Sequence, residues 1–513
     1  MKTNVICILI TIIAYLLMMI LIGIRASKKN NDVGDFYLGG RKLGPIVTAM
    51  SAEASDMSSY LLMGLPGLAY LTGLCDVGWT VIGLAAGTYL NWLITAKRLR
   101  IYSHRINAIT VPDFFSKRYQ EKNSVIMGVS ALIILIFFIP YTASGFAACG
   151  KLFGTLFGWD YHMAMFLSAI IIISYTSIGG FLAASTTDLI QSIAMTAALI
   201  IIVFFGISTA GGVDAVMTNA HSLAGYFSLS ELHDPETKTA SHYGFITVIS
   251  TLAWGLGYFG MPHILLRFMA IEDASKIKLS RRIASVWVVI SMAVAVFIGI
   301  IGNALSANGS IAVLTGNDSE TVIMKMAELM SEHGILAALF AGLIFAGILA
   351  CTMSTSDSQL LAASSSMSEN FIKGVFKVKL TDKQSMMIAR IVLIVIAVLS
   401  IFIAWNPDSS VFGIVSFAWA GFGATFGPLM IASLFWKRSN QYGAAACLLF
   451  GGITVFVWKF LVRPMGGAFN IYELLPAFIV GGIAMIIVSL LTPAPDKAVT
   501  EEFDSVNAEL KKA

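Results

Sequence analysis

Long apolar stretches, separated by short polar and charged segments, run along almost the whole chain. With a window of about 19 residues and a need for about 20 apolar residues per crossing, this pattern predicts about thirteen membrane-spanning helices. The predicted spans lie near residues 4–24, 45–70, 73–96, 124–150, 162–180, 188–210, 244–268, 284–304, 334–366, 385–405, 411–436, 442–461 and 472–492. The pattern therefore predicts an all-α polytopic membrane protein.

The composition supports this interpretation and excludes a water-soluble globule. Of the 513 residues, 57% are hydrophobic and only 12% are charged, whereas soluble domains carry about 25% charged residues. The net charge of +4 does not indicate a nucleic-acid partner, because the basic residues lie in loops that flank the predicted spans. The five cysteines all lie in apolar segments without a CxxC pair, so we expect packing roles for them.

Positively charged residues gather in every second loop between the predicted spans. Basic groups follow the spans 4–24 and 73–96, whereas the opposite loops hold only scattered cations such as Lys151 and Lys238. Under the positive-inside rule, the N-terminus is external and the C-terminus is cytoplasmic, in a multi-pass protein of the cell (inner or plasma) membrane. Charges that only improve solubility would not alternate in this way.

Two polar segments lie outside the predicted spans. Residues 211–243 form an external loop that we expect to hold a short helix. Residues 493–513 are polar and charged with little apolar periodicity, so we expect a mobile cytoplasmic tail.

The second predicted span contains acidic residues that a membrane segment does not tolerate without a reason. Pro45 to Tyr70 includes Glu53 and Asp56 together with four serines. A carboxylate at the centre of a spanning helix is disfavoured by about 2.5–3.5 kcal/mol, so two of them within four residues need a partner such as a cation or internal water. This span is therefore the first candidate for a binding site.

Two predicted spans carry helix-breaking residues in corresponding places. The first break lies in 51–66, and the second lies in 254–262, where three glycines and a proline stand among apolar residues. Because four predicted spans separate them, they occupy the same position in two successive five-span units, which are inverted relative to each other. Close helix packing also uses glycine, but Trp254, Tyr258 and Pro262 on the second segment favour a binding site.

A third polar cluster, residues 351–359, lies in the third span of the second unit. Ser354 and Thr355 offer hydroxyl oxygens, and unwound carbonyls near Asp56 offer more, a set that suits a small hard cation. The alternative is that these hydroxyls bond back to the preceding turn of their own helix. Asp357 adds a third membrane-embedded carboxylate that needs its own explanation.

Five segments of the chain resemble the sodium/solute symporter family, most closely its sodium/proline branch. They are SAEASDMSSYLLMGLPG, WGLGYFGMPHILLRFMA, GGFLAASTTDLIQS, MSTSDSQLL and FAWAGFGATFGP. The resemblance covers nearly the whole chain and implies the inverted-repeat fold of the leucine-transporter type, with one extra N-terminal and two extra C-terminal helices. The corresponding divisions are 1–44, first repeat 45–210, external loop 211–243, second repeat 244–436, peripheral helices 437–492 and tail 493–513.

The resemblance also implies a sodium site and places its ligands. The main-chain oxygens of Ala54, Met57 and Cys351 and the hydroxyls of Ser354 and Thr355 match the family's sodium ligands. Sodium is then the coupling ion rather than a resident cofactor.

Residues for coupling and for the solute follow from the same resemblance. Asp56 matches the acidic residue needed for sodium-coupled uptake, and Asp188 matches an acidic position that in some relatives belongs to a second cation pathway. The positions near the solute are Ser58, Gly64, Tyr141, Trp254, Tyr258 and Pro262.

Three residues depart from the pattern of the proline branch. Glu53 stands where a small residue is usual, Met261 where a polar one is usual, and Asp357 where a hydroxyl is expected. The extra carboxylates could hold a further cation, take a proton or change the solute preference, so the stoichiometry stays open. Met261 could reshape the pocket toward a bulkier solute.

The residues themselves favour a small zwitterion, which half-helix amides and aromatic rings would hold. With the resemblance, we expect a transporter, not an enzyme, that takes up L-proline with sodium by alternating access. The alternatives are another small amino acid or a carboxylate, or proton coupling, and, from other classes, a solute sensor or a channel. We expect a small-molecule substrate and the lipid bilayer as partners, and neither a nucleic acid nor an obligate protein partner.

Overall fold

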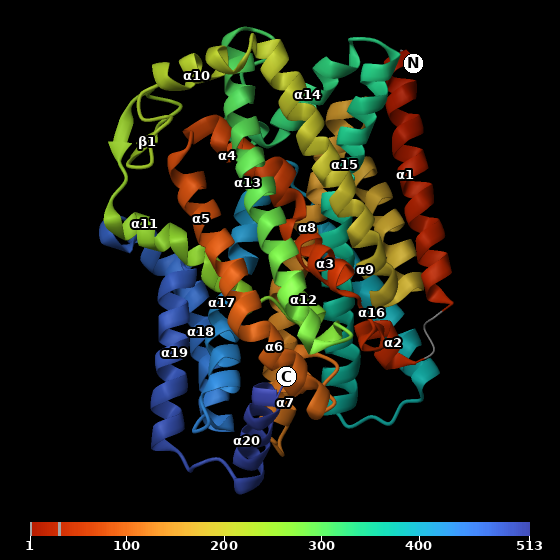
Figure 1. Ribbon diagram of the computed structural model, residues 1–513, viewed down its shortest axis with the longest axis vertical. Coiled ribbons are helices and arrows are strands. Elements are labelled where there is room, and N and C mark those ends of the chain that lie inside the picture. Colours follow the sequence, from red (N-terminus) through yellow and green to blue (C-terminus); the bar gives the residue numbers. More distant parts are fainter. Residues whose placement is uncertain (1–2, 29–31, 513) are drawn as a thin grey trace.

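The computed structural model describes residues 3–28 and 32–512, and helices make up most of it (Figure 1). Residues 1, 2 and 29–31 of the expected N-terminal segment, and residue 513 of the tail, lie outside the described part. The α-helices are α1 (Thr3–Ser27), α2 (Val33–Leu38), α3 (Pro45–Ser59), α4 (Leu65–Thr72), α5 (Cys75–Leu90), α6 (Ala96–Arg105), α7 (Val111–Arg118), α8 (Val125–Phe157), α9 (Tyr161–Ala210), α10 (Val213–Ser222), α11 (Phe245–Leu252), α12 (Pro262–Ala270), α13 (Ile277–Ala307), α14 (Val322–Ser331), α15 (Ile335–Ser365), α16 (Asp382–Ile403), α17 (Val411–Phe435), α18 (Gln441–Val457), α19 (Leu474–Leu491) and α20 (Lys497–Lys512).

Shorter helical turns connect or extend these helices. They are η1 (Gly39–Arg41), η2 (Tyr60–Gly64), η3 (Asn91–Thr95), η4 (Ala253–Phe259), η5 (Ala274–Lys276), η6 (Gly316–Thr321), η7 (Ser366–Val375), η8 (Trp458–Val462), η9 (Arg463–Met465) and η10 (Gly467–Phe469). Two short strands, β1 (Glu231–His233) and β2 (Ala240–His242), pair antiparallel with Glu231 opposite His242. The polar segment 211–243 therefore holds the expected short helix, α10, and also a hairpin that the sequence did not predict.

Ten helices of the described residues are long and apolar enough to cross a membrane, and eleven if the bent pair Phe245–Phe259 and Pro262–Ala270 counts as one span. Two differences account for the larger number expected. Helix α9 has 50 residues and includes both predicted spans 162–180 and 188–210. The second predicted span, 45–70, is divided among α3, η2 and α4 and is not among the ten. The count of thirteen stays a prediction.

Helix α9 is too long for a single crossing. Fifty helical residues would extend about 75 Å, more than twice the roughly 30 Å of a bilayer core. Gly180 interrupts its helical dihedral angles, with φ 63° and ψ −164°. Glycine reaches this region at low cost because it has no Cβ. We therefore interpret α9 as two spans that meet at Gly180.

The polar helix α3 lies at the centre of the helical bundle. It packs against α15, α9, α13 and α12, and every residue from Thr48 to Ser59 is buried. Helix α1 lies outside this group and packs on α9 and α15 (Figure 1). Polar side chains of α3 are thus enclosed by protein, which is where a membrane protein can hold them.

Both predicted helix breaks are present. In the first, Ser58 leaves the helical region near the end of α3, and the π-helical turn η2 follows. In the second, α11 continues into the tighter turn η4, and α12 starts at Pro262 after a bend of 45°. Because proline lacks an N–H and is tolerated in a first helical turn, it suits the start of the second half-helix.

The expectation of a mobile C-terminal tail is wrong for the residues that the structure describes. Helix α20 packs against α6 (Figure 1) and buries Val499, Phe503 and Val506. Arg105 Nε donates to Glu502 Oε1 at 2.5 Å. The low overall hydrophobicity of the tail hid three apolar side chains at helical spacing, and those side chains form one face.

Candidate functional site

The break in α3 faces the polar cluster of α15. Ser354 Oγ donates to the main-chain oxygen of Ala54 at 2.8 Å. Ser354 and Thr355 also reach the main-chain oxygen of Cys351, at 3.2 and 3.3 Å. The Cys351 thiol contacts the main-chain oxygen of Ser58. Four of the five expected sodium ligands therefore lie together, from segments about 300 residues apart in the chain.

The main chain at this point is held away from regular helix. Ser58 has a φ of 44° and a ψ of −171°, and its hydroxyl accepts a hydrogen bond from the Tyr60 N–H at 3.1 Å. A non-glycine residue in a sparsely populated backbone region costs about 1–3 kcal/mol. Met57, the fifth expected ligand, directly precedes the break and is buried. The break leaves carbonyl oxygens outside a regular ladder, where they suit a cation.

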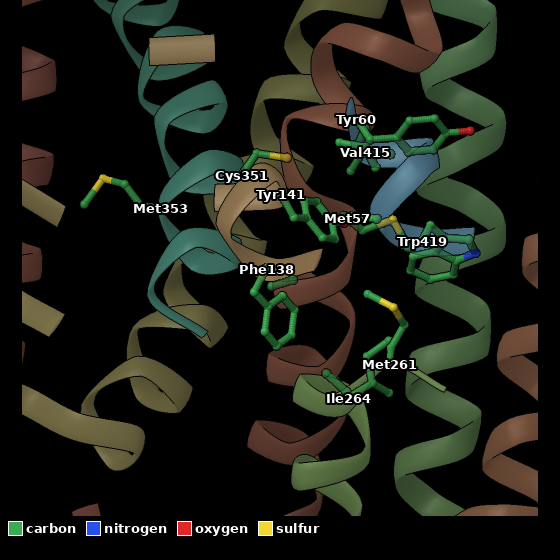
Figure 2. Close-up of a cluster of buried hydrophobic side chains, with 14 of the residues drawn as sticks. Met57, Tyr60, Phe138, Tyr141, Met261, Ile264, Cys351, Met353, Val415 and Trp419 are labelled. Carbon is green, nitrogen blue, oxygen red and sulfur yellow. The ribbon is translucent and has the colours of Figure 1, made fainter. Parts of the chain in front are cut away.

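A small cavity lies on the other side of the break. Figure 2 shows Met57, Tyr60, Tyr141, Val415 and Trp419 around this region. The lining residues are Asp56, Met57, Tyr60, Leu84, Tyr141, Trp254, Met292, Val415 and Trp419. The cavity has a volume of only about 10 Å³, which is enough for about one water molecule. A solute of several heavy atoms enters only after these side chains move.

Asp56 provides the charged group of the cavity. Tyr258 Oη donates to Asp56 Oδ2 at 2.6 Å, and Tyr141 Oη donates weakly to the main-chain oxygen of Asp56 at 3.5 Å. The other carboxylate oxygen, Oδ1, is buried without a hydrogen-bond partner. An unpaired buried carboxylate oxygen is costly, so it is the atom most in need of a bound partner.

The expected solute-binding residues divide into two groups. Tyr141 and Trp254 line the cavity, Ser58 forms the break beside it, and Tyr258 reaches it through Asp56. Gly64 and Pro262 do not line the cavity. Their backbones instead shape the two breaks, Gly64 in η2 and Pro262 at the start of α12.

Met261 is fully buried directly before Pro262. Figure 2 shows its side chain extending toward Met57 and Trp419. Met261 is not among the residues that line the cavity. Its influence on solute size remains a prediction.

Two other expected acidic residues join a separate buried network. Asp188 Oδ2 accepts from Ser51 Oγ at 2.6 Å and from Arg267 Nη2 at 3.2 Å. Arg267 and Asp188 are at most 1% exposed. Arg267 Nη2 also donates to Ser358. This arginine was missed at the sequence level, although a cation in a membrane span is itself a signal of a buried partner.

Asp357 belongs to the same network. Tyr175 Oη donates to Asp357 Oδ2 at 2.9 Å, and Ser358 Oγ donates to Asp357 Oδ1 at 3.1 Å. Both carboxylate oxygens are thus hydrogen-bonded. Arg267 pairs with Asp188 and donates to Ser358, which in turn donates to Asp357, so this arginine connects the two carboxylates.

Glu53 is the remaining acidic residue of α3, and it does not join that network. Trp92 Nε1 donates to Glu53 Oε1 at 2.9 Å. Glu53 Oε2 is buried without a partner. Trp92 packs its ring on Phe268, with 4.4 Å between the ring centroids.

Several lining residues were not predicted. Trp419 Nε1 donates to the main-chain oxygen of Trp254 at 2.8 Å, which connects α17 to η4. Tyr60 stacks on Trp254 with 5.9 Å between centroids. Aromatic residues are common in all spans of this chain, so their type alone did not separate lining from packing.

An ion pair covers the end of α17 near the cavity. Lys151 Nζ donates to Glu320 Oε2 at 2.8 Å, and both side chains are largely buried. Glu320 Oε1 also accepts from Ser410 Oγ and from the Phe412 N–H, each at 3.1 Å. A carboxylate at a helix N-terminus interacts favourably with the helix dipole. The loop of η6 is therefore tied to the helix that carries Val415.

Arg41 ties several segments together at the opposite end of the bundle. Its guanidinium donates to the main-chain oxygens of Met269 at 2.7 Å and of Ser103 at 3.1 Å, and it also contacts Ala108. Burial, reinforced by nearby Arg100, lowers the pKa of Arg41 to about 10. It stays charged at neutral pH and links η1, α6 and α12.

The sequence and the fold both match known transporters. The pattern of the Sodium:solute symporter family matches residues 36–451. The chain is 42% identical to the sodium/proline symporter of Haemophilus influenzae, over 98% of both chains. It is 41% identical to the osmoregulated proline transporter OpuE of Bacillus subtilis, over 98% of this chain and 99% of that one. It is 39% identical to the sodium/proline symporter of Escherichia coli, over 98% of this chain and 96% of that one.

Solved structures share the fold at lower sequence identity. A Na+-coupled sialic acid symporter in a substrate-bound, outward-open state has a TM-score of 0.78 and 19% identity, with 96% of this chain and 99% of that one covered. MhsT in complex with L-phenylalanine has a TM-score of 0.53 and 13% identity, with 88% and 98% covered. These similarities bear out the fold of the leucine-transporter type.

Proposed function

Because this chain belongs to the sodium:solute symporter family, we propose that it carries L-proline into the cell together with sodium. Its most similar relatives named above are sodium/proline symporters and a proline transporter. The chain aligns with nearly their full length.

One observation carries the sodium part of the proposal. Ser354 on α15 donates to the main-chain oxygen of Ala54 at 2.8 Å, one helical turn before the break at Ser58. Carbonyl and hydroxyl oxygens from an unwound helix are ligands that a small hard cation prefers. We propose that sodium is bound here by Ala54, Met57, Cys351, Ser354 and Thr355.

The cavity supports a small zwitterionic solute. Trp254 and Tyr141 offer aromatic faces to a compact apolar ring, and a secondary ammonium is compatible with such faces. Asp56 lies in the same cavity with one unpartnered carboxylate oxygen. We assign Ser58, Tyr141, Trp254 and Tyr258 to the solute, and Gly64 and Pro262 to the backbone shape around it.

The energy available from sodium is sufficient for uptake. One charge that moves through about 100 mV supplies about 2.3 kcal/mol, and a tenfold sodium gradient adds about 1.4 kcal/mol. Together these would support several hundredfold accumulation of proline. We propose that the two repeat bundles move around the two breaks to expose the site to each side in turn.

We also propose the arrangement in the membrane. The N-terminus is external and the C-terminal helix α20 is cytoplasmic, as the basic loops indicate. The first repeat is 45–210 and the second is 244–436, with 1–44, 211–243, 437–492 and 493–513 outside the ten-span core. This order accounts for the positions of α3 and of α11 with α12 as the first span of each repeat.

Sodium-driven proline uptake into proteoliposomes tests the function. We expect accumulation of labelled proline with an inward sodium gradient and none with an equal potassium gradient. Ser354→Ala should raise the sodium concentration for half-maximal uptake at least tenfold, because a hard-cation ligand is lost. Ser364→Ala is the matched control on α15, since that hydroxyl donates to the main-chain oxygen of Leu361 and lies beside Tyr37 rather than among the expected sodium ligands.

Two results would contradict the proposal. Wild-type protein that accumulates no proline under a sodium gradient would refute proline symport. Equal sodium dependence in Ser354→Ala and Ser364→Ala would refute the assigned sodium site. A panel of other amino acids in a thermal-shift assay, with and without sodium, identifies a different solute if one is preferred.

A further inference from the structure

We propose that the chain holds a second monovalent cation, taken as Na+, at a site between α3, α5 and η4. Its side-chain ligands are the carboxylates of Glu53 and Asp56, the hydroxyl of Thr88 and the amide oxygen of Asn91. The inference concerns ion binding, and its role in uptake rests on the proposed function.

The first observation concerns the two carboxylates. Glu53 and Asp56 are one helical turn apart on α3 and are 1% and 6% exposed. Each has one oxygen bonded to a neutral donor, Trp92 or Tyr258. Each has its other oxygen buried without a partner. Among the described residues, no basic side chain forms an ion pair with either of them, whereas Asp188 has Arg267.

The second observation is independent of the acidic residues. Thr88 and Asn91 lie one turn apart on α5 and η3, and both are at most 1% exposed. Thr88 Oγ1 and Asn91 Oδ1 are buried without a hydrogen-bond partner. Buried polar groups are nearly always satisfied in native proteins. Neutral oxygens and carboxylate oxygens that all lack a partner indicate a bound cation, because a cation is coordinated by several oxygen atoms at once.

Contacts to η4 bring these groups into one place. Asn91 Nδ2 donates to the main-chain oxygen of Tyr258 at 2.9 Å. The Thr88 hydroxyl lies close to the Tyr258 phenol but makes no hydrogen bond of good geometry with it. The same phenol donates to Asp56. Next to Asn91, Trp92 donates to Glu53. Tyr258 and Trp92 thus connect the α5 face to both carboxylates.

The local backbone departs from regular helix beside this face and packs tightly against η4. Residues Asn91–Thr95 form a π-helical turn, and such turns are frequent at functional sites. A Cβ on Gly87 would collide with the carbonyl of Gly255, so α5 and η4 are in backbone contact. This close approach holds the segment that carries Thr88 and Asn91 against η4.

Charge balance favours a monovalent cation here. When both buried carboxylates are ionised they carry two negative charges, the proposed sodium at Ala54 and Ser354 supplies one positive charge, and zwitterionic proline supplies none. One further positive charge completes the balance. Oxygen ligands without sulfur or ring nitrogen suit Na+ rather than a transition metal. The new site lies on the α5 side of α3, and the first sodium site lies on the α15 side.

A direct count of bound sodium tests the site without any transport. Purified full-length protein is equilibrated with 22Na+ in potassium-free buffer. We expect two sodium ions per wild-type chain, one per chain in Glu53→Gln and one per chain in Ser354→Ala. One ion in the wild type, unchanged in Glu53→Gln, would overturn the proposal, and it is the result expected if Glu53 instead holds a proton.

A milder variant keeps the test valid if Glu53→Gln does not fold. Thr88→Val keeps the side-chain shape and removes one oxygen, so the weaker sodium dissociation constant should rise about tenfold. Thr80→Val is the control on α5, because the Thr80 hydroxyl bonds only to Asp76 of its own helix. Equal sodium affinities of the two variants would overturn the site.

The count separates this proposal from the proposed function. Two bound ions with no sodium-driven proline uptake would refute symport and leave the site standing. Sodium-driven proline uptake with a single bound ion would refute the second site and leave symport standing. With both intact, the ratio of sodium to proline from reversal potentials in proteoliposomes should be two in the wild type and one in Glu53→Gln.

Discussion

Hydroxyl and carboxylate groups decide the chemistry at the residue scale. The sequence alone located Glu53, Asp56, Ser354 and Thr355, because polar side chains in apolar spans are conspicuous. It did not give their partners. Trp92, which bonds to Glu53, belongs to a residue type that is also common in packing roles.

The phenol of Tyr258 offers a test at this scale. Tyr258→Phe removes the 2.6 Å hydrogen bond to Asp56 and leaves both carboxylate oxygens without a protein donor. Hydrogen bonds to charged groups contribute about 1.5–3 kcal/mol, so we expect kcat/KM for sodium-driven proline uptake to fall at least tenfold.

Tyr102→Phe is the control for this variant, because the Tyr102 hydroxyl is buried without a hydrogen-bond partner. Initial uptake rates at several proline concentrations give the comparison. If both variants transported proline as the wild type does, the contact between Tyr258 and Asp56 would have no part in transport.

Broken and reversing helices position the site at the element scale. Both breaks were predictable, since glycine, proline and polar residues cluster at 51–66 and 254–262. The contact of α5 with η4 was not, because the glycines of α5 look like ordinary small-residue packing in the sequence. Only the structure shows that Gly87 faces the backbone of Gly255.

That contact predicts the effect of a single added methyl group. Gly87→Ala would place a Cβ against the Gly255 carbonyl, and overpacking of this kind costs about 1–3 kcal/mol. Since η4 carries Trp254 and Tyr258, we expect KM for proline to rise by about tenfold or more. Uptake kinetics measure the change.

Gly154→Ala on α8 is the matched substitution, because its nearest neighbour, the Trp159 carbonyl oxygen, lies 3.6 Å from the added Cβ. It should leave KM unchanged. A Gly87→Ala protein with wild-type KM would show that η4 does not depend on this contact.

At the scale of the whole molecule, charged side chains tie segments together at both ends of the bundle. Lys151 with Glu320 ties η6 to α17, and Arg41 ties η1 to α6 and α12. The polytopic helical architecture followed from hydropathy, whereas the orientation indicated by the alternation of basic loops stays a prediction. The docked tail did not, because its three apolar residues are too few to raise the average hydrophobicity of the segment.

Docking of the tail is testable by proteolysis. Phe503 is 6% exposed and lies under Arg118, 5.0 Å from the ring centroid. Burial of a phenylalanine contributes about 1.5–3 kcal/mol, so Phe503→Ala should speed trypsin cleavage at Lys497 by at least tenfold. Glu501→Ala on the exposed face of α20 should not, and equal cleavage of both variants would mean that the tail is not held by this face.

The unwound backbone at Ser58 connects the two sides of the break. Two residues of this stretch contact different neighbours: Asp56 lines the cavity, and the main-chain oxygen of Ser58 contacts the Cys351 thiol. A cation that pulls on the carbonyls must therefore shift the carboxylate beside the solute, because the backbone between them is shared. The shared backbone would limit uncoupled leakage, because neither sodium nor solute reaches its full affinity while the other is absent.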